Sequence, residues 1–279
     1  MDRIDTHLHL IYPDRFRYDW AAGIPALADK AFTLEDYHAA AAGCGITGSI
    51  FMEVDVPAEQ AVGEAAWFCA MAEDPASRMA GVIAACRPED PGMAACFDSP
   101  LHPRLVGFRR ILHTQPDDLS LSPVFRDNVA RVGAAGLTFD LCVLPRQMAN
   151  GAALVDTCPA TTFILDHCGV PDIASGDLSS WREQLRELAR RPNLMCKISG
   201  IIAYAGAEGL GPDMLRPVVE HTIDRFGWDR VVWGSDWPVC NLTRDLTSWT
   251  RWLDEILAGT SDGERAALYH GNARRIYRL

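Results

Sequence analysis

Arg3-Ile-Asp-Thr-His-Leu-His-Leu10 stands almost at the first residue of this chain of 279 residues. Its alternating character predicts a β-strand, and because successive side chains of a strand project to opposite faces, His7 and His9 point the same way. Two imidazoles on one wall are typical of a functional site. The alternative is a strand that simply carries two solvent-facing histidines, and the rest of the chain decides between these interpretations.

Short β-type runs alternate with longer helical runs along the whole chain. After the first strand and a long aromatic loop at 11–32, further strands are expected at 47–54, 79–86, 105–112, 137–143, 162–169, 194–200 and 230–238. Helices are expected between them, at 57–73, 123–133, 179–190 and 212–226. Eight strands alternating with helices predict an α/β fold, a parallel sheet closed into a (β/α)8 TIM barrel.

The main competitor is an open doubly wound sheet, but the fingerprint G-x-G-x-x-G is missing after the first strand. No repeat or linker divides the chain, so residues 1–279 are expected to form a single barrel domain. The tail at 261–279 has a capping-box-like start at Ser261-Asp-Gly-Glu264 and is expected to pack across the last helices.

Composition restricts the class of partner. The 37 acidic and 26 basic residues give a net charge of -11, which argues against nucleic acid or an anionic membrane surface and favours a small-molecule substrate. The nine cysteines include no C-x-x-C pair and sit in apolar runs, as buried thiols do in a reducing compartment. With no leader-like N-terminus and no apolar stretch long enough to span a bilayer, a cytoplasmic protein is expected.

In a TIM barrel the chemistry lies at the C-terminal ends of the strands. Polar residues that fall at these ends are His7, His9, Arg109, Arg110, Asp166, His167, Lys197, Ser199 and Asp236. Closure of the barrel brings the last strand beside the first, so Asp236 is expected next to the histidine pair. Taken singly, several of them have a structural alternative: Asp236 as a turn residue, His167 as a core histidine, and Lys197 and Ser199 as surface or layer residues.

The ordered set of motifs resembles the amidohydrolase superfamily. The motifs are His-x-His at 7–9, Gly-Phe-Arg at 107–109, Asp-His-Cys-Gly at 166–169, Lys-Ile-Ser-Gly at 197–200, Gly-Ser-Asp-Trp-Pro at 234–238 and Asn-Ala-Arg-Arg-Ile-Tyr at 272–277. More narrowly, the chain resembles the sugar-lactone hydrolases, namely the L-fuconolactonase and L-rhamnono-lactonase-like proteins with the related 2-pyrone-4,6-dicarboxylate lactonases. This resemblance implies hydrolysis of an aldonolactone to the aldonic acid.

The sequence departs from the two-metal members of the superfamily. In them a carboxylated Lys or a Glu on the fourth strand bridges the metals and a His on the fifth is a ligand, whereas here the fourth strand offers Arg109 and Arg110 and the fifth has no His. Metal-independent catalysis is therefore favoured, since an arginine aimed at the pocket repels a divalent cation. A single zinc ion is the alternative, held by His7, His9, Asp236 and His167.

The expected mechanism is attack of water on the lactone carbonyl. Asp236 is the expected general base, and the imidazoles of His7, His9 and His167 are expected around the carbonyl oxygen. Residues expected to contact the substrate are Arg109, Lys197, Tyr18, Trp20 and Trp237. A pyrone dicarboxylate is the second candidate, because Arg15, Arg17 and Arg109 could receive its carboxylates.

Two other classes stay open. A metal-dependent decarboxylase of the same superfamily shares the histidine pair and the last-strand Asp, but it normally keeps the fifth-strand His. The other class is a barrel without chemistry that serves as a binding partner. Trp233, Trp249 and Trp252 suit either helix packing or the interface of a homo-oligomer.

Overall fold

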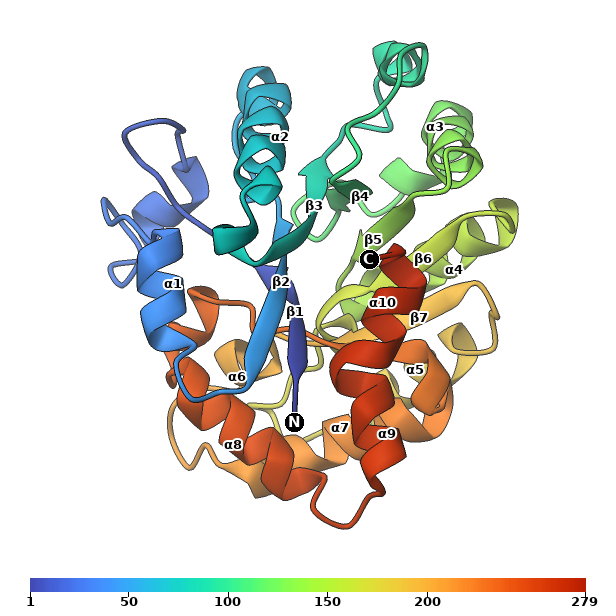
Figure 1. Ribbon diagram of the computed structural model, residues 1–279. Helices are drawn as coiled ribbons and strands as arrows, with labels where there is room; N and C mark the ends of the chain where they lie inside the picture. Colours follow the sequence, from blue (N-terminus) through green and yellow to red (C-terminus); the bar gives the residue numbers. More distant parts are fainter.

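The computed structural model describes residues 1–279, and its centre is a barrel of eight parallel strands in sequence order (Figure 1). The strands are β1 Arg3–Leu8, β2 Ile46–Met52, β3 Met79–Ala85, β4 Leu105–Ile111, β5 Thr138–Cys142, β6 Thr162–Leu165, β7 Leu194–Ile198 and β8 Val231–Trp233. Each pairs in parallel with the next, and β1 meets the segment that follows β8 through a parallel bridge between Leu8 and Trp237. The predicted TIM barrel is confirmed.

Helices surround the sheet, as Figure 1 shows. They are α1 Leu34–Ala40, α2 Ala58–Glu73, α3 Pro123–Ala134, α4 Met148–Thr157, α5 Ser179–Leu188, α6 Ile201–Tyr204, α7 Pro212–Phe226, α8 Leu246–Ile256, α9 Asp262–Ala266 and α10 Asn272–Tyr277. The predicted capping box at Ser261 and Glu264 opens α9. The sequence patterns missed α4, whose many small residues give no strong apolar period, and only 3-10 turns stand between β3 and β4.

Two of the strands end four and five residues before the expected positions, whereas the other ends agree to within two residues. β6 stops at Leu165 and β8 at Trp233, whereas strands were expected to continue to 169 and 238. The backbone turns there because His167 and Asp236 take left-handed φ angles of 53° and 58°. An extended strand cannot include such residues, so the polar ends become turns at the mouth of the barrel.

Apolar side chains fill the barrel below the polar cluster, from its N-terminal end as far as Met52 at the end of β2. They come from the inward faces of the strands and from α10, and we call them the barrel floor: Ile4, Ile50, Met52, Ile83, Val106, Ile164, Met195, Val232, Ala273, Ile276 and Tyr277. The tail was expected to pack across the last helices. The part before α10 does so, because the Tyr269 hydroxyl donates to Asp254 of α8 (2.8 Å), whereas the apolar face of α10 closes the floor.

The three tryptophans left open by the sequence are core residues. Trp233 and Trp249 have no exposed surface, and Trp252 is 9% exposed. All nine cysteines are free thiols and eight of them are buried.

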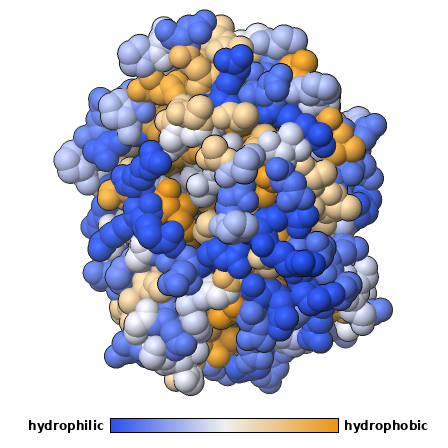
Figure 2. All heavy atoms as spheres, turned by 90° about the vertical axis from the view of Figure 1, so that its right-hand side faces the viewer, coloured by the Kyte–Doolittle hydropathy of each residue, from blue (hydrophilic) through white to orange (hydrophobic).

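None of the helices has the length and apolarity needed to cross a bilayer. The face of the molecule in Figure 2 is mainly hydrophilic, with small separate hydrophobic groups.

Candidate active site

The histidine pair and the last-strand carboxylate meet where β1 lies beside β8. The Nε2 atoms of His7 and His9 are 3.2 Å apart, and Oδ1 of Asp236 lies 3.6 Å from the first and 3.4 Å from the second. Backbone bonds fix this arrangement, because the Asp236 N–H donates to the His7 carbonyl (2.9 Å) and the His9 N–H donates to the Trp237 carbonyl (2.8 Å). Barrel closure therefore creates the cluster.

The hydrogen bonds of His9 determine its tautomer. Its Nδ1 is 3.0 Å from the Met52 carbonyl oxygen, which can only accept, so Nδ1 carries the hydrogen. Unless the ring is doubly protonated, a lone pair on Nε2 then faces the Nε2 atom of His7. Burial and the nearby Lys197 ammonium lower the pKa of His7 well below its usual value. His7 is consequently neutral at physiological pH.

A glycine makes room for two of the polar groups. Gly200 follows β7 with a φ of +64°, a conformation that side chains disfavour. A Cβ at this position would lie 2.3 Å from Nδ1 of His167 and 2.8 Å from Oδ2 of Asp236. The Lys-Ile-Ser-Gly motif therefore needs glycine for space and for conformation. Its serine contributes as well, because Ser199 Oγ is 3.0 Å from Nδ1 of His167.

A buried carboxylate that the sequence analysis missed ties the first strand to the last. Asp5 has no exposed surface, and its carboxylate accepts the N–H groups of Ser235 (2.8 Å) and His7 (3.1 Å) and the hydroxyl of Tyr37 (2.7 Å). These bonds fix the backbone on both sides of the cluster. The signal was its place two residues before His7, on the same face of the strand.

Arg109 enters the site from β4 with most of its donors in use. Its Nε donates to Glu53 Oε1 at 2.6 Å, and its Nη2 donates to the Glu53 carbonyl at 2.8 Å. Nη1 lies 3.3 Å from His7 Nε2 and 3.5 Å from Asp166 Oδ2. Arg110 points the other way and pairs with Glu89. Glu53, at the end of β2, was another residue that the sequence analysis missed.

Lys197 lies beneath the cavity and not on its wall. Its side chain is fully buried, with Nζ 2.5 Å from Asp140 Oδ1 and 3.1 Å from Asp166 Oδ1. Asp166 Oδ1 is in turn 3.6 Å from Nδ1 of His7. Burial would raise the pKa of Asp166, but Lys197 and His7 outweigh it and hold that pKa well below the usual range. Asp166 is therefore an anion that faces His7 from behind.

A cavity of about 240 Å³ opens above this cluster. The residues that line it are His9, Trp20, Ile24, Val54, Asp55, Arg109, Ile111, His113, Thr114, Cys142, His167, Tyr204, Asp236, Val239 and Leu242. Of the residues expected at the site, the structure thus brings five to the wall: His9, Trp20, Arg109, His167 and Asp236. His7 lies directly behind them, fully buried.

Two of the expected aromatic contacts lie outside the cavity. Tyr18 is 9% exposed, and its hydroxyl accepts the N–H of Tyr12. Trp237 is 3% exposed and packs against Phe32 and Tyr37. Both rings stabilise the loop and helix that follow β1, because large aromatic side chains beside a core usually pack into it. Trp20 reaches the cavity, with its indole N–H donated to the Val54 carbonyl at 2.8 Å.

The opposite wall of the cavity holds residues that the sequence analysis did not select. Cys142 ends β5, and its Sγ lies 3.2 Å from Nδ1 of His113. Burial and the nearby Arg109 guanidinium together lower the pKa of His113 to about 4, and burial raises the pKa of the Cys142 thiol. The pair is neutral at pH 7. Tyr204, on α6, lines the cavity and has its ring edge-on to His167.

The donor set fits one divalent ion. His7, His9 and Asp236 offer three ligand atoms within 4.8 Å of one another, and a second set of His7, Asp166 and His167 shares His7. Two imidazole nitrogens and one carboxylate oxygen are common ligands of catalytic zinc. The bond from His9 to the Met52 carbonyl is of the kind that orients a metal-binding histidine. The first set is the better fit, because Lys197 already occupies Asp166.

Comparison with known proteins gives consistent results. The profile of the amidohydrolase family matches residues 4–279. An L-fucono-1,5-lactonase of Burkholderia multivorans is 32% identical over 298 aligned residues, 99% of this chain and 96% of the relative. One of Burkholderia ambifaria is 35% identical over 184 residues, 63% of this chain and 62% of the relative. A crystal structure of a Burkholderia multivorans amidohydrolase with bound zinc has a TM-score of 0.90 at 29% identity, covering 100% of both chains.

Proposed function

Because this chain belongs to the amidohydrolase family, we propose that it is a lactonase that hydrolyses the ring ester of a sugar lactone to the aldonic acid. The carrying observation is the small cavity of about 240 Å³ with an available carboxylate on its wall. Oδ2 of Asp236 is buried and has no hydrogen-bond partner. An acceptor left free beside a cavity is suited to take a proton from water.

In the proposed reaction Asp236 is the general base. Water attacks the lactone carbonyl carbon and gives a proton to Oδ2 of Asp236, and the carbonyl oxygen becomes an oxyanion. When the ring C–O bond breaks, the proton passes from Asp236 to the leaving ring oxygen. This step forms the hydroxy acid and restores the Asp236 carboxylate as the base. No oxidant or other reactant is needed, because water supplies both the nucleophile and the proton.

Two donors on the wall are placed to stabilise the oxyanion. Arg109 is held by Glu53, and one of the two hydrogens on its Nη2 has no acceptor within the chain, which leaves a donor for the oxyanion. Burial lowers the pKa of His167, which makes it a neutral imidazole, and its Nδ1 faces Ser199. With the Ser199 hydroxyl donating to Nδ1, His167 presents an N–H at Nε2. Fixed donors of this kind lower the barrier because they need no reorientation in the transition state.

The charges of the cavity favour a neutral lactone over a dicarboxylate. Of the arginines expected to receive carboxylates, Arg109 is bound to Glu53, Arg17 pairs at the surface with Asp19 and Glu59, and Arg15 lies over the ring of Trp67. Arg15 and Arg17 do not line the cavity. A pyrone dicarboxylate would therefore bury two negative charges without free cations, which is costly.

We propose that turnover does not require a metal, although the donor set fits one. The contact of Arg109 Nη1 with His7 Nε2 at 3.3 Å supports this, since the donated N–H uses the lone pair that a metal would need. When a zinc ion is bound, His7, His9 and Asp236 would hold it, and it would supply a Lewis acid for the carbonyl. The amidohydrolase of similar fold with bound zinc makes this the alternative to test.

A substrate panel combined with a metal assay tests the proposal on one preparation. Initial rates are measured on a set of aldonolactones, on 2-pyrone-4,6-dicarboxylate and on a dihydroxybenzoate, with metal content determined before and after chelator treatment. We expect lactone hydrolysis that survives metal removal. Turnover of the dicarboxylate alone, or of the aromatic acid alone, would replace the proposed substrate class. Loss of activity on stripping with recovery on adding zinc would establish the zinc mechanism instead.

We also infer that the protein works in a reducing compartment such as the cytoplasm, because its nine cysteines are all free thiols. Mass spectrometry of thiols alkylated in intact cells would test this. Fully reduced thiols agree with the inference, and a disulfide in the native protein contradicts it.

A further inference from the structure

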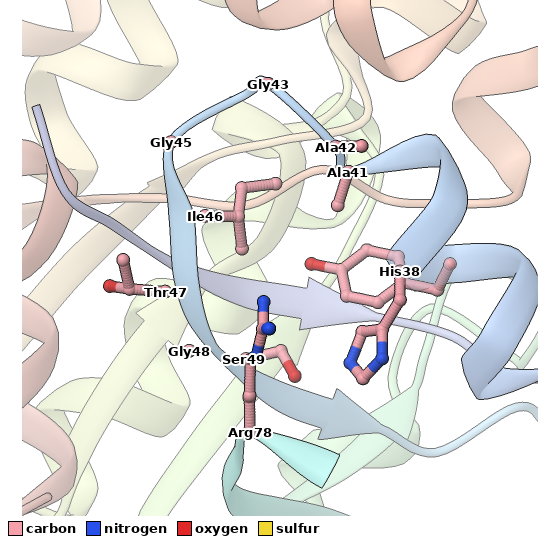
Figure 3. Close-up of a pocket in the computed structure, with 11 residues that line it drawn as sticks. His38, Ala41, Ala42, Gly43, Gly45, Ile46, Thr47, Gly48, Ser49 and Arg78 are labelled. Atoms are coloured by element: carbon pink, nitrogen blue, oxygen red, sulfur yellow. The ribbon is translucent and has the colours of Figure 1, made fainter. Parts of the chain in front are cut away.

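Two adjoining cavities lie at the N-terminal end of β2, on the side of the barrel away from the candidate active site. The larger, of about 570 Å³, lies between α1 and β2 (Figure 3). The smaller, of about 310 Å³, lies under the starts of β1 and β3. They share Thr47, Gly48 and Arg78, and neither has a residue in common with the catalytic cavity.

Three arginines without partners line the smaller cavity. They are Arg78, Arg104 and Arg274, and none of the three guanidinium groups makes an ion pair or a hydrogen bond within the chain. The chain has a net charge of -11, so carboxylates are abundant elsewhere, and Arg110, for example, lies 2.6 Å from Glu89. Three unpaired cations around one hollow produce a local positive potential in an acidic protein.

Arg78 links the two cavities at some conformational cost. Its φ is 53°, in the left-handed region where glycine or asparagine is usual. The conformation places a long cationic side chain at the junction of the two cavities. Figure 3 shows Arg78 beside Ser49 and His38 in the larger cavity.

The wall of the larger cavity carries an unsatisfied hydroxyl. Ser49 is 1% exposed, and its Oγ has no hydrogen-bond partner in the chain. His38 Nε2 donates to the Ser77 carbonyl at 3.2 Å, so its Nδ1 is available on the other side of the ring. The remaining lining consists mainly of small residues, alanines and glycines of the segment 41–48. A buried polar group without a partner needs an explanation, and a ligand is one.

We propose that this junction binds a small organic anion, a carboxylate or a phosphate ester, that is distinct from the lactone. Its charged group lies among the guanidinium groups of Arg78, Arg104 and Arg274, which offer planar pairs of donors to oxyanions. Its uncharged, hydroxyl-bearing part extends into the larger cavity toward Ser49 and His38. Asp74 also lines the smaller cavity and its Oδ1 accepts the N–H of Ala76, but its carboxylate forms no ion pair with any of the three arginines, so three cations face one carboxylate there.

Calorimetric titration of the full chain at low ionic strength tests the proposal with three probes. Inorganic phosphate represents phosphate esters, gluconate represents hydroxy acids, and sorbitol is the uncharged counterpart of gluconate. We expect one of the two anions, or both, to bind with one ligand per chain, while sorbitol does not bind. The anion that binds shows whether the charged group of the ligand is a phosphate or a carboxylate. Absence of binding for both anions overturns the proposal, and so does equal binding of sorbitol.

Variants separate this site from the catalytic cavity. Arg78→Gly removes the guanidinium and suits the left-handed backbone, so this variant is expected to fold; Arg274→Gln is a second, independent change. We expect both to weaken the anion at least tenfold, and Arg182→Gln, an exposed arginine on α5, to change the affinity less than twofold. Equal affinity in all three proteins overturns the site. Gluconate is itself an aldonic acid, and binding at the catalytic cavity would leave its affinity unchanged in Arg78→Gly and Arg274→Gln. The variants therefore separate the anion site from the proposed lactonase site.

Discussion

The same eight strands form both ends of the barrel, but the side chains at the two ends differ in chemical character. At the C-terminal end the strands deliver charged groups, and the backbone leaves the extended region at His167 and Asp236 to direct them inward. At the N-terminal end the floor is apolar and is closed by Ala273, Ile276 and Tyr277 of α10. The floor can therefore supply stability, while the mouth holds polar groups whose burial is costly. This difference teaches that variants at the mouth and in the floor should have separable effects.

The largest effect is expected from Asp236→Asn at the mouth. An amide cannot take a proton from water, so kcat should fall by about 10²–10⁴-fold, with KM changed only a few fold. Steady-state kinetics on the best lactone measures both. Asp224→Asn, an exposed position on α7, is the matched control. A rise in KM at unchanged kcat would remove Asp236 from the role of base.

Ile83→Ala in the floor is expected to lower stability strongly and to leave activity nearly unchanged. Ile83 has no exposed surface, so the truncation leaves a cavity and should lower the free energy of unfolding by about 2–5 kcal/mol, with kcat within twofold. Urea unfolding followed by tryptophan fluorescence measures the loss. Ile83→Val is the graded control, at about 0.5–1.5 kcal/mol. A parallel loss of kcat in folded protein would contradict the separation of the two ends.

Gly200→Ala should lower activity without removing any functional group. The added Cβ would lie 2.3 Å from Nδ1 of His167, so this ring and Asp236 must move. A displacement of about 1 Å at a catalytic centre costs on the order of 10²-fold in kcat/KM. The exposed Gly176, with a φ of +73° and open space around it, is the control for backbone strain alone. Equal activity losses in Gly176→Ala and Gly200→Ala would contradict the steric explanation.

The smallest effect concerns pH and again distinguishes the two ends. His113 at the mouth has a folded pKa of about 4, below the usual 6.5, so the unfolded chain binds more protons between these values. Its contribution to stability is complete above pH 6.5 and is lost as the pH falls toward 4. His113→Asn should reduce the fall in unfolding free energy between pH 7.5 and 5 by about 1–2 kcal/mol. An unchanged pH dependence would show that His113 is not held neutral by the fold.

The sequence by itself determined the barrel and the partners across its seam. Short apolar runs separated by helical stretches have few ways to bury both faces of a parallel sheet, and a closed barrel is one of them. His7 and His9 share a face because strand side chains alternate. Asp236 comes near them because closure joins the last strand to the first, a topological consequence that needs no detailed packing.

Only the tertiary structure decided which side chains reach the cavity. Lys197 lies beneath it because Asp140 and Asp166 hold its ammonium, and Tyr18 and Trp237 pack into neighbouring elements. Tyr204 reaches the wall through the course of the chain after β7, which no local pattern encodes. Periodicity records which face of an element is buried. The depth and direction of a side chain depend on backbone turns and on partners far away in the sequence, and these exist only in the folded chain.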